Sequence, residues 1–165
     1  MSAQTKLIAP VTPISDSRHL GLGLVRLLNK ALATEIVCVL RYRRHHFMAR
    51  RLGSNRIAEE FLLHADEELS QADLLAERIV QLGGEPDFAP QTLQERTHVE
   101  YSAVPAAADM HQEILVAKIG AINSYRGLID CIGESDPITR RLLEGILGVE
   151  QAHHEELLEL LPDDK

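Results

Sequence analysis

The run Arg140–Glu155, RRLLEGILGVEQAHHE, decides the fold of this chain. Its leucines and isoleucines recur every three or four residues, which is the spacing of an amphipathic helix. Glu150 and His153 are three residues apart, so they lie on one face of that helix beside its apolar stripe. A carboxylate and an imidazole directed into a packed bundle cost free energy unless they are paired or bind a metal. The stretch therefore predicts a polar site inside a helical bundle.

The composition is that of a single domain with a substantial core, at 165 residues. Its hydrophobic content is 45%, but no run reaches the roughly 20 apolar residues of a membrane span. The N-terminus contains no apolar signal core. A formal net charge of −8 argues against binding nucleic acid by bulk attraction. We therefore expect a cytoplasmic protein that binds neither a membrane nor a nucleic acid.

Clusters of glycine, proline and small polar residues divide the chain into four helical segments. Residues 1–15 hold two prolines and no apolar period, so we expect an extended tail. Asp136 is expected to cap the last helix, with Pro137 in its first turn. The predicted helices span residues 16–52, 56–82, 106–132 and 137–161.

The connection over residues 85–104 shows no helical period and is long enough to travel the full length of a bundle. The other two connections are short. The predicted fold is therefore all-α, an antiparallel four-helix bundle over residues 16–162, with two hairpins joined by a long crossover between the second and third helices.

Each helix carries a polar group on an otherwise apolar face. Any one of these groups could be a salt bridge or a solvated helix edge. Four helices that each place such a group at mid-length favour a shared internal site. The groups are Glu35 on the first helix, Glu68 and Gln71 on the second, Lys118 on the third, and Glu150 and His153 on the fourth.

These motifs resemble those of a known family over residues 20–161. Several short stretches carry the resemblance to the ferritin-like superfamily, in its bacterioferritin-like and Dps-like branch. They are Asn29–Glu35 with Tyr42 in the first helix; Glu68–Asp73 and Leu82–Pro86 around the second; and Tyr125-Arg126, Asp136-Pro137 and Glu150–His153 in the third and fourth.

The resemblance implies a ferritin-like bundle with an iron centre of one or two ions. It implies Glu35, Glu68, Glu150 and His153 as metal ligands, and the three glutamates with Tyr42 as catalytic groups of a ferroxidase reaction. Tyr42 is interpreted either as an electron donor or as a phenol bonded to a core carboxylate. Haem is not expected, because Leu69 stands where haem-binding members have methionine.

Two positions depart from the family pattern. Gln71 stands in place of a histidine and Lys118 in place of a glutamate. Three carboxylates and one ammonium give a formal charge of −3 + 1 = −2, which matches one divalent ion or none. We expect Lys118 to take the place of the second metal, bridging Glu68 or Glu150, because an ammonium has no lone pair for a metal.

The first metal position would be formed by Glu35, Glu68 and Glu150, and Gln71 could offer it an amide oxygen. His64 and His46 could supply a ligand from one turn away, although a capping or stacking role is preferred for His46.

Three functions remain open at this point. The first is an iron-binding homo-oligomer, from a dimer to a 12-subunit shell, that oxidises, stores or detoxifies iron through an altered ferroxidase centre. The second is a non-enzymatic shell or partner-binding protein whose core holds a lysine–carboxylate cluster. The third is a carboxylate-site oxygenase that uses an unusual metal or an oxidised side chain.

Overall fold

The computed structural model describes residues 17–101 and 107–159, with side chains from residue 21 and from residue 110 onward in the two ranges. The tail predicted over residues 1–15 lies outside the described residues. Four long helices and two short ones are present: α1 (Ser17–Arg51), α2 (Asn55–Gln81), η1 (Pro90–Thr92), α3 (Leu93–Arg96), α4 (Ala107–Ile132) and α5 (Pro137–Glu159).

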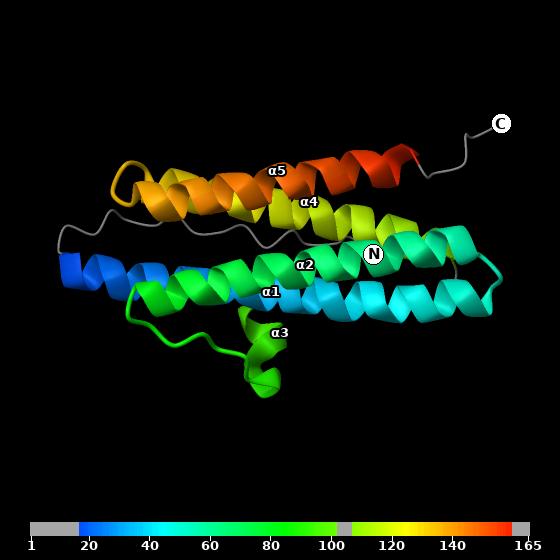
Figure 1. Ribbon diagram of the computed structural model, residues 1–165, viewed down its shortest axis with the longest axis horizontal. Helices are drawn as coiled ribbons and strands as arrows, with labels where there is room; N and C mark the ends of the chain where they lie inside the picture. Colours follow the sequence, from blue (N-terminus) through cyan, green and yellow to red (C-terminus); the bar gives the residue numbers. More distant parts are fainter. Residues whose placement is uncertain (1–16, 102–106, 160–165) are drawn as a thin grey trace, which may run out of the picture.

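The long helices form two hairpins that pack side by side (Figure 1). The α1–α2 hairpin contacts the α4–α5 hairpin through α1 with α4 and α2 with α5. Helices α2 and α4 run in the same direction, so the connection between them must return along the length of the bundle. A helix as long as α4 spans about 39 Å, which is the distance that this connection must cover. The predicted all-α antiparallel bundle with a long crossover is confirmed.

The crossover contains regular structure that the sequence analysis did not predict. The expectation of an aperiodic connection was wrong for η1 and α3, which begin at Pro90. Leu93 is buried against the core, and Arg96 donates hydrogen bonds to the carbonyl oxygens of Asn29 and Asp87. These contacts with α1 stabilise a helix that is too short to show a period of its own.

The helix ends follow local chemistry. The cap predicted at Asp136 is confirmed, because its Oδ1 accepts hydrogen bonds from the backbone N–H groups of Ile138 and Thr139. Gly53 closes α1 with φ of 79°, a conformation that suits glycine. Within the described ranges, no helix combines the length and apolar character needed to cross a bilayer.

The core consists of two apolar clusters, one at each end of the bundle. The first includes Phe61, Met110 and Leu157. The second includes Leu28 and Leu143. The polar residues singled out from the sequence lie between these clusters, so apolar packing encloses them on both sides.

Candidate metal centre

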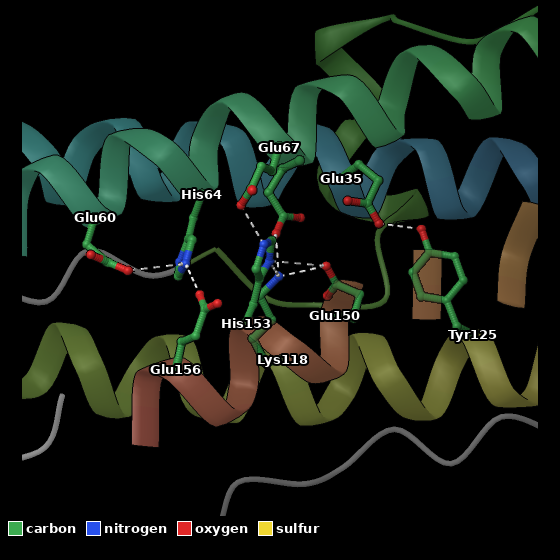
Figure 2. A network of polar contacts seen from close by, with 10 residues as sticks. Glu35, Glu60, His64, Glu67, Lys118, Tyr125, Glu150, His153 and Glu156 are labelled. Atoms are coloured by element: carbon green, nitrogen blue, oxygen red, sulfur yellow. Dashed lines mark hydrogen bonds and ion pairs between the residues drawn. The ribbon is translucent and has the colours of Figure 1, made fainter. Parts of the chain in front are cut away.

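The four long helices each bring a polar side chain to the middle of the bundle, as the sequence predicts (Figure 2). The two that α2 contributes are three residues apart, as are the two that α5 contributes, so each pair lies on the inward face of its helix. All six are buried: Glu35 on α1, Glu68 and Gln71 on α2, Lys118 on α4, and Glu150 and His153 on α5.

Lys118 lies at the centre of this group. Its Nζ donates hydrogen bonds to Glu68 Oε1 and, at 2.7 Å, to Glu150 Oε1. His153 Nδ1 lies 3.2 Å from the same nitrogen. The Tyr42 ring lies beneath the ammonium, with its centroid 5.6 Å from Nζ. The ammonium thus donates to two carboxylates and lies beside one imidazole nitrogen.

Burial and pairing act in opposite directions on Lys118 and Glu68. Burial alone would lower the pKa of Lys118, but the charges of Glu68 and Glu150 hold it well above its usual value. Burial alone would likewise raise the pKa of Glu68, but the Lys118 charge holds it well below its usual value. Both groups are therefore ionised at neutral pH and form a buried ion pair.

Glu35 and Glu150 are shifted the other way. Burial, followed by the charges of Glu68 and Glu150, raises the pKa of Glu35 well above its usual value. Burial, followed by the Glu68 charge, raises the pKa of Glu150 to about 7. Burial therefore favours the protonated form of Glu35, which accepts a hydrogen bond from the Tyr125 hydroxyl.

These protonation states bear on the formal charge of −2, which matches one divalent ion, or none if protons or partners make up the difference. The count of −2 assumed three ionised carboxylates. The raised pKa values of Glu35 and Glu150 favour protons on these carboxylates, which reduces the negative charge of the cluster without a metal. A metal that binds there must displace one or two protons.

Several oxygen atoms remain available as ligands. With the carboxylates ionised, the Oε2 atoms of Glu35, Glu68 and Glu150 are buried with no hydrogen-bond donor among the described residues. Both side-chain polar atoms of Gln71 are also buried without a partner. Carboxylate and amide oxygens suit a hard or borderline divalent ion. At this centre, ligand atoms of Glu68, Glu150 and His153 lie within 4.8 Å of one another, so these three residues could hold one ion.

His153 is held on both sides of its ring. Its Nε2 lies 2.6 Å from Glu67 Oε2, and its Nδ1 lies 3.5 Å from Glu68 Oε1. Burial opposes the charged ring, but the hydrogen bond with Glu68 raises the pKa of His153 above its usual value. The sequence analysis missed Glu67, although its position three residues after His64 places both on one face of α2.

Tyr42 differs from one of its two interpretations, whereas His46 has the capping or stacking role preferred for it. The Tyr42 hydroxyl is buried without a hydrogen-bond partner among the described residues, so the interpretation of Tyr42 as a phenol bonded to a core carboxylate was wrong. Tyr125 on α4 makes such a hydrogen bond instead, donating its hydroxyl to Glu35. His46 lies away from the centre, where its Nδ1 contacts the carbonyl oxygen of Ala58 at 2.6 Å.

Glu113 also lies outside the centre. It forms ion pairs with Arg41 Nε at 3.1 Å and His45 Nε2 at 2.9 Å. Helix α4 therefore presents Lys118, and not Glu113, to the other three long helices.

Burial lowers the pKa of His64, so its ring is neutral near pH 7. The ring stacks on His153 with centroids 4.3 Å apart and an interplanar angle of 25°. Its Nε2 faces Glu156 on α5. His64 thus extends the polar centre along the α2–α5 interface.

Comparisons with known proteins agree with this geometry. A family model described as a ferritin-like domain matches residues 25–165. A bacterioferritin of Desulfovibrio desulfuricans is 33% identical over 129 residues, covering 78% of this chain and 69% of the relative. A nutrient stress-induced DNA-binding protein of Synechococcus is 34% identical over 140 residues, covering 77% and 75%.

Solved structures show the same fold. The bacterioferritin-related protein of Bacteroides fragilis, described as a dodecameric thioferritin, superposes with a TM-score of 0.79 at 25% identity, over 84% of each chain. The Desulfovibrio desulfuricans bacterioferritin superposes with a TM-score of 0.80 at 24% identity, over 89% of this chain and 82% of the other. The resemblance stated from the motifs is confirmed, and the chain belongs to the ferritin-like family, with bacterioferritins among its relatives.

Proposed function

We propose that this protein is a bacterioferritin-like iron-binding protein, concerned with iron oxidation, storage or detoxification, whose centre holds one metal ion at most. The supporting observation is the hydrogen bonding of Lys118 Nζ to Glu68 and Glu150. These are the two carboxylates that the family resemblance makes bridging ligands between two irons. An ammonium carries a positive charge at that place without offering a lone pair.

The remaining position suits one ion bound by Glu35, Glu68 and Glu150, with Gln71 supplying an amide oxygen. An iron ion there would supply one-electron exchange with oxygen or peroxide. The chain's own residues would hold the ion, Glu35 and Glu150 would give up their protons to solvent as it binds, and the two apolar clusters would exclude bulk water. Tyr42, whose hydroxyl has no carboxylate partner, remains the proposed electron donor.

The competing proposal is a metal-free core. It draws support from the same pKa shifts, because protons on Glu35 and Glu150 reduce the negative charge of the cluster. The protein would then act through its surface, as a shell-forming or partner-binding subunit. An oxygenase with an unusual metal is less well supported, since no observation favours a substrate cavity at the centre.

Assembly into a homo-oligomer is part of the proposal. Large apolar side chains are exposed on α1 and α2, among them Leu40, Phe47, Leu63 and Leu74, and such patches mark contact surfaces. One structural relative is described as dodecameric. Another relative is named as DNA-binding, but the net charge of −8 favours a function of this chain without nucleic acid.

The test is the number of ferrous ions bound per subunit without oxygen, followed by oxygen uptake. Glu35→Gln is the control that removes a ligand of the centre, so ions at the centre are counted as the difference between the two proteins. We expect one ion or none in the native chain, and a second ion with faster oxygen uptake in Lys118→Glu/Gln71→His. Two ions at the native centre with rapid oxidation would contradict the role given to Lys118. No gain of metal in a folded double variant would favour the metal-free core.

A further inference from the structure

A second cluster of ligand-type side chains lies along the α2–α5 interface, on the far side of His153 from Glu35 (Figure 2). His64 Nε2 lies 3.2 Å from Glu156 Oε2 and 4.0 Å from Glu60 Oε1. One ligand atom from each of these three residues lies within 4.8 Å of the others. The His64 ring is buried, whereas the side chains of Glu60 and Glu156 are 30% and 52% exposed.

Hydrogen bonding from His64 reaches only one of the two carboxylates. A neutral imidazole has one N–H, so Nε2 can donate to only one of the two carboxylates. Glu60, at 4.0 Å, is beyond hydrogen-bond distance. Both glutamates face His64 Nε2, and His64 Nδ1 is buried without a partner among the described residues. Two carboxylates therefore converge on one neutral imidazole.

The spacing suits a metal ion. Zinc-type bonds of about 2.0–2.1 Å in a tetrahedron place neighbouring ligand atoms about 3.3 Å apart. The Nε2–Glu156 distance of 3.2 Å already meets that value. The Nε2–Glu60 distance of 4.0 Å exceeds it by about 0.7 Å, which rotation of a partly exposed glutamate side chain can supply.

The imidazole is held in position before any metal binds. It stacks on His153 with a centroid distance of 4.3 Å. It also makes a T-shaped contact with the Tyr42 ring, with centroids 5.3 Å apart and an interplanar angle of 77°. A buried, oriented ligand loses little conformational entropy on binding. The exposed carboxylates leave the fourth coordination position open to solvent.

We propose that Glu60, His64 and Glu156 form a solvent-facing site for a single divalent first-row transition-metal ion, separate from the centre around Lys118. One imidazole with two carboxylates selects this class over Mg²⁺ or Ca²⁺, which prefer oxygen ligands alone. Its three residues differ from Glu35, Glu68, Glu150 and Gln71, the ligands proposed for the Lys118 centre, and it meets that centre through the stacking of His64 on His153.

The test uses Zn²⁺, which has no redox chemistry, with the full-length protein after removal of metals by a chelator. Isothermal titration gives the affinity, and the ¹⁵N chemical shifts of the imidazole nitrogens report which ring binds. The variant Glu60→Gln/Glu156→Gln removes both carboxylates of the proposed site, and both side chains are partly exposed to solvent. The matched control is Glu59→Gln/Glu155→Gln, which makes the same change at exposed neighbouring positions.

We expect the native protein to bind Zn²⁺ with a shift at His64 Nε2. The Glu60/Glu156 variant should bind at least about tenfold more weakly, and the Glu59/Glu155 control should bind as the native chain does. Equal affinity in the variant and its control would overturn the proposal, as would an unchanged His64 nitrogen at saturating Zn²⁺.

Glu35→Gln separates this proposal from the one on function. If Glu35→Gln retains the Zn²⁺ signal at His64, the site is independent of the Lys118 centre. If Glu35→Gln abolishes all Zn²⁺ binding, the ion occupies the Lys118 centre, and the proposal of a separate site is wrong while that of a single-metal centre stands.

Discussion

Replacing Lys118 by methionine tests whether the ammonium is what allows three carboxylates to be buried together. Methionine keeps a similar unbranched side chain and removes the charge, which leaves Glu68 buried without its cation. A carboxylate in that situation takes up a proton. Protonating an acid with an ordinary pKa of 4.5 costs about 3.4 kcal/mol at pH 7, from 2.5 pH units at 1.36 kcal/mol each. That value lies within the 3–5 kcal/mol typical of breaking a buried ion pair from one side.

The sign of the pH dependence follows from the same argument. In the native protein the pKa of Glu68 is depressed, so its pair stabilises the fold above pH 4.5 and loses that effect as the pH falls through the folded-state pKa. In Lys118→Met the folded-state pKa of Glu68 is raised, so the variant loses stability as the pH rises above 4.5. The protonation cost should therefore grow from about 0.7 kcal/mol at pH 5 to about 3.4 kcal/mol at pH 7.

Urea unfolding followed by circular dichroism at pH 5, 6 and 7 measures this difference, with a chelator present and at one protein concentration. Lys30→Met is the control, because Lys30 is exposed on α1. A loss in Lys118→Met of less than about 1 kcal/mol that does not change with pH would show that Glu68 does not depend on Lys118.

Three further predictions concern other parts of the molecule. Asp136→Ala should lower the free energy of unfolding by about 2–3 kcal/mol at pH 7, because it removes a helix cap and a partly buried bond with Arg78. Burial would raise the pKa of Asp136, but its bonds with Thr139 and Arg78 lower it. The loss measured by urea unfolding should therefore shrink as the pH falls below 3.8, and a loss unchanged at pH 3 would contradict the assignment. Ferrous ion affinity at the centre should rise at least about tenfold from pH 6 to pH 8, since Glu150, with a pKa of about 7, must lose its proton to bind. Anaerobic chelator competition measures the affinity, and a flat profile would refute the prediction. Phe47→Glu should reduce the mass of the assembly found by light scattering, because Phe47 is 63% exposed on α1; an unchanged mass would place the subunit contact elsewhere.

The helices and the inward faces of the bundle could be predicted because apolar periodicity directly reflects burial. Lys118 is seven residues, about two turns, before Tyr125, which places both on the buried face of α4. The short helix α3 could not be predicted, because Leu93 and Arg96 acquire their order from contacts with α1. Such contacts join residues more than 60 positions apart, as in the bond from Arg96 to Asn29.

The centre was harder to predict, because the sequence identifies its residues but not their protons. Counting ionised groups gives −2, which matches one divalent ion, or none if protons or partners make up the difference. Burial raises the pKa values of Glu35 and Glu150, so protons provide the missing positive charge. The same residues can therefore form a metal site or a stable neutral cluster. Which state is populated depends on whether the free energy of metal binding exceeds the cost of releasing those protons. Lys118 shifts that balance toward the neutral cluster by pairing permanently with Glu68, and a gain of metal in Lys118→Glu/Gln71→His would measure the size of that shift.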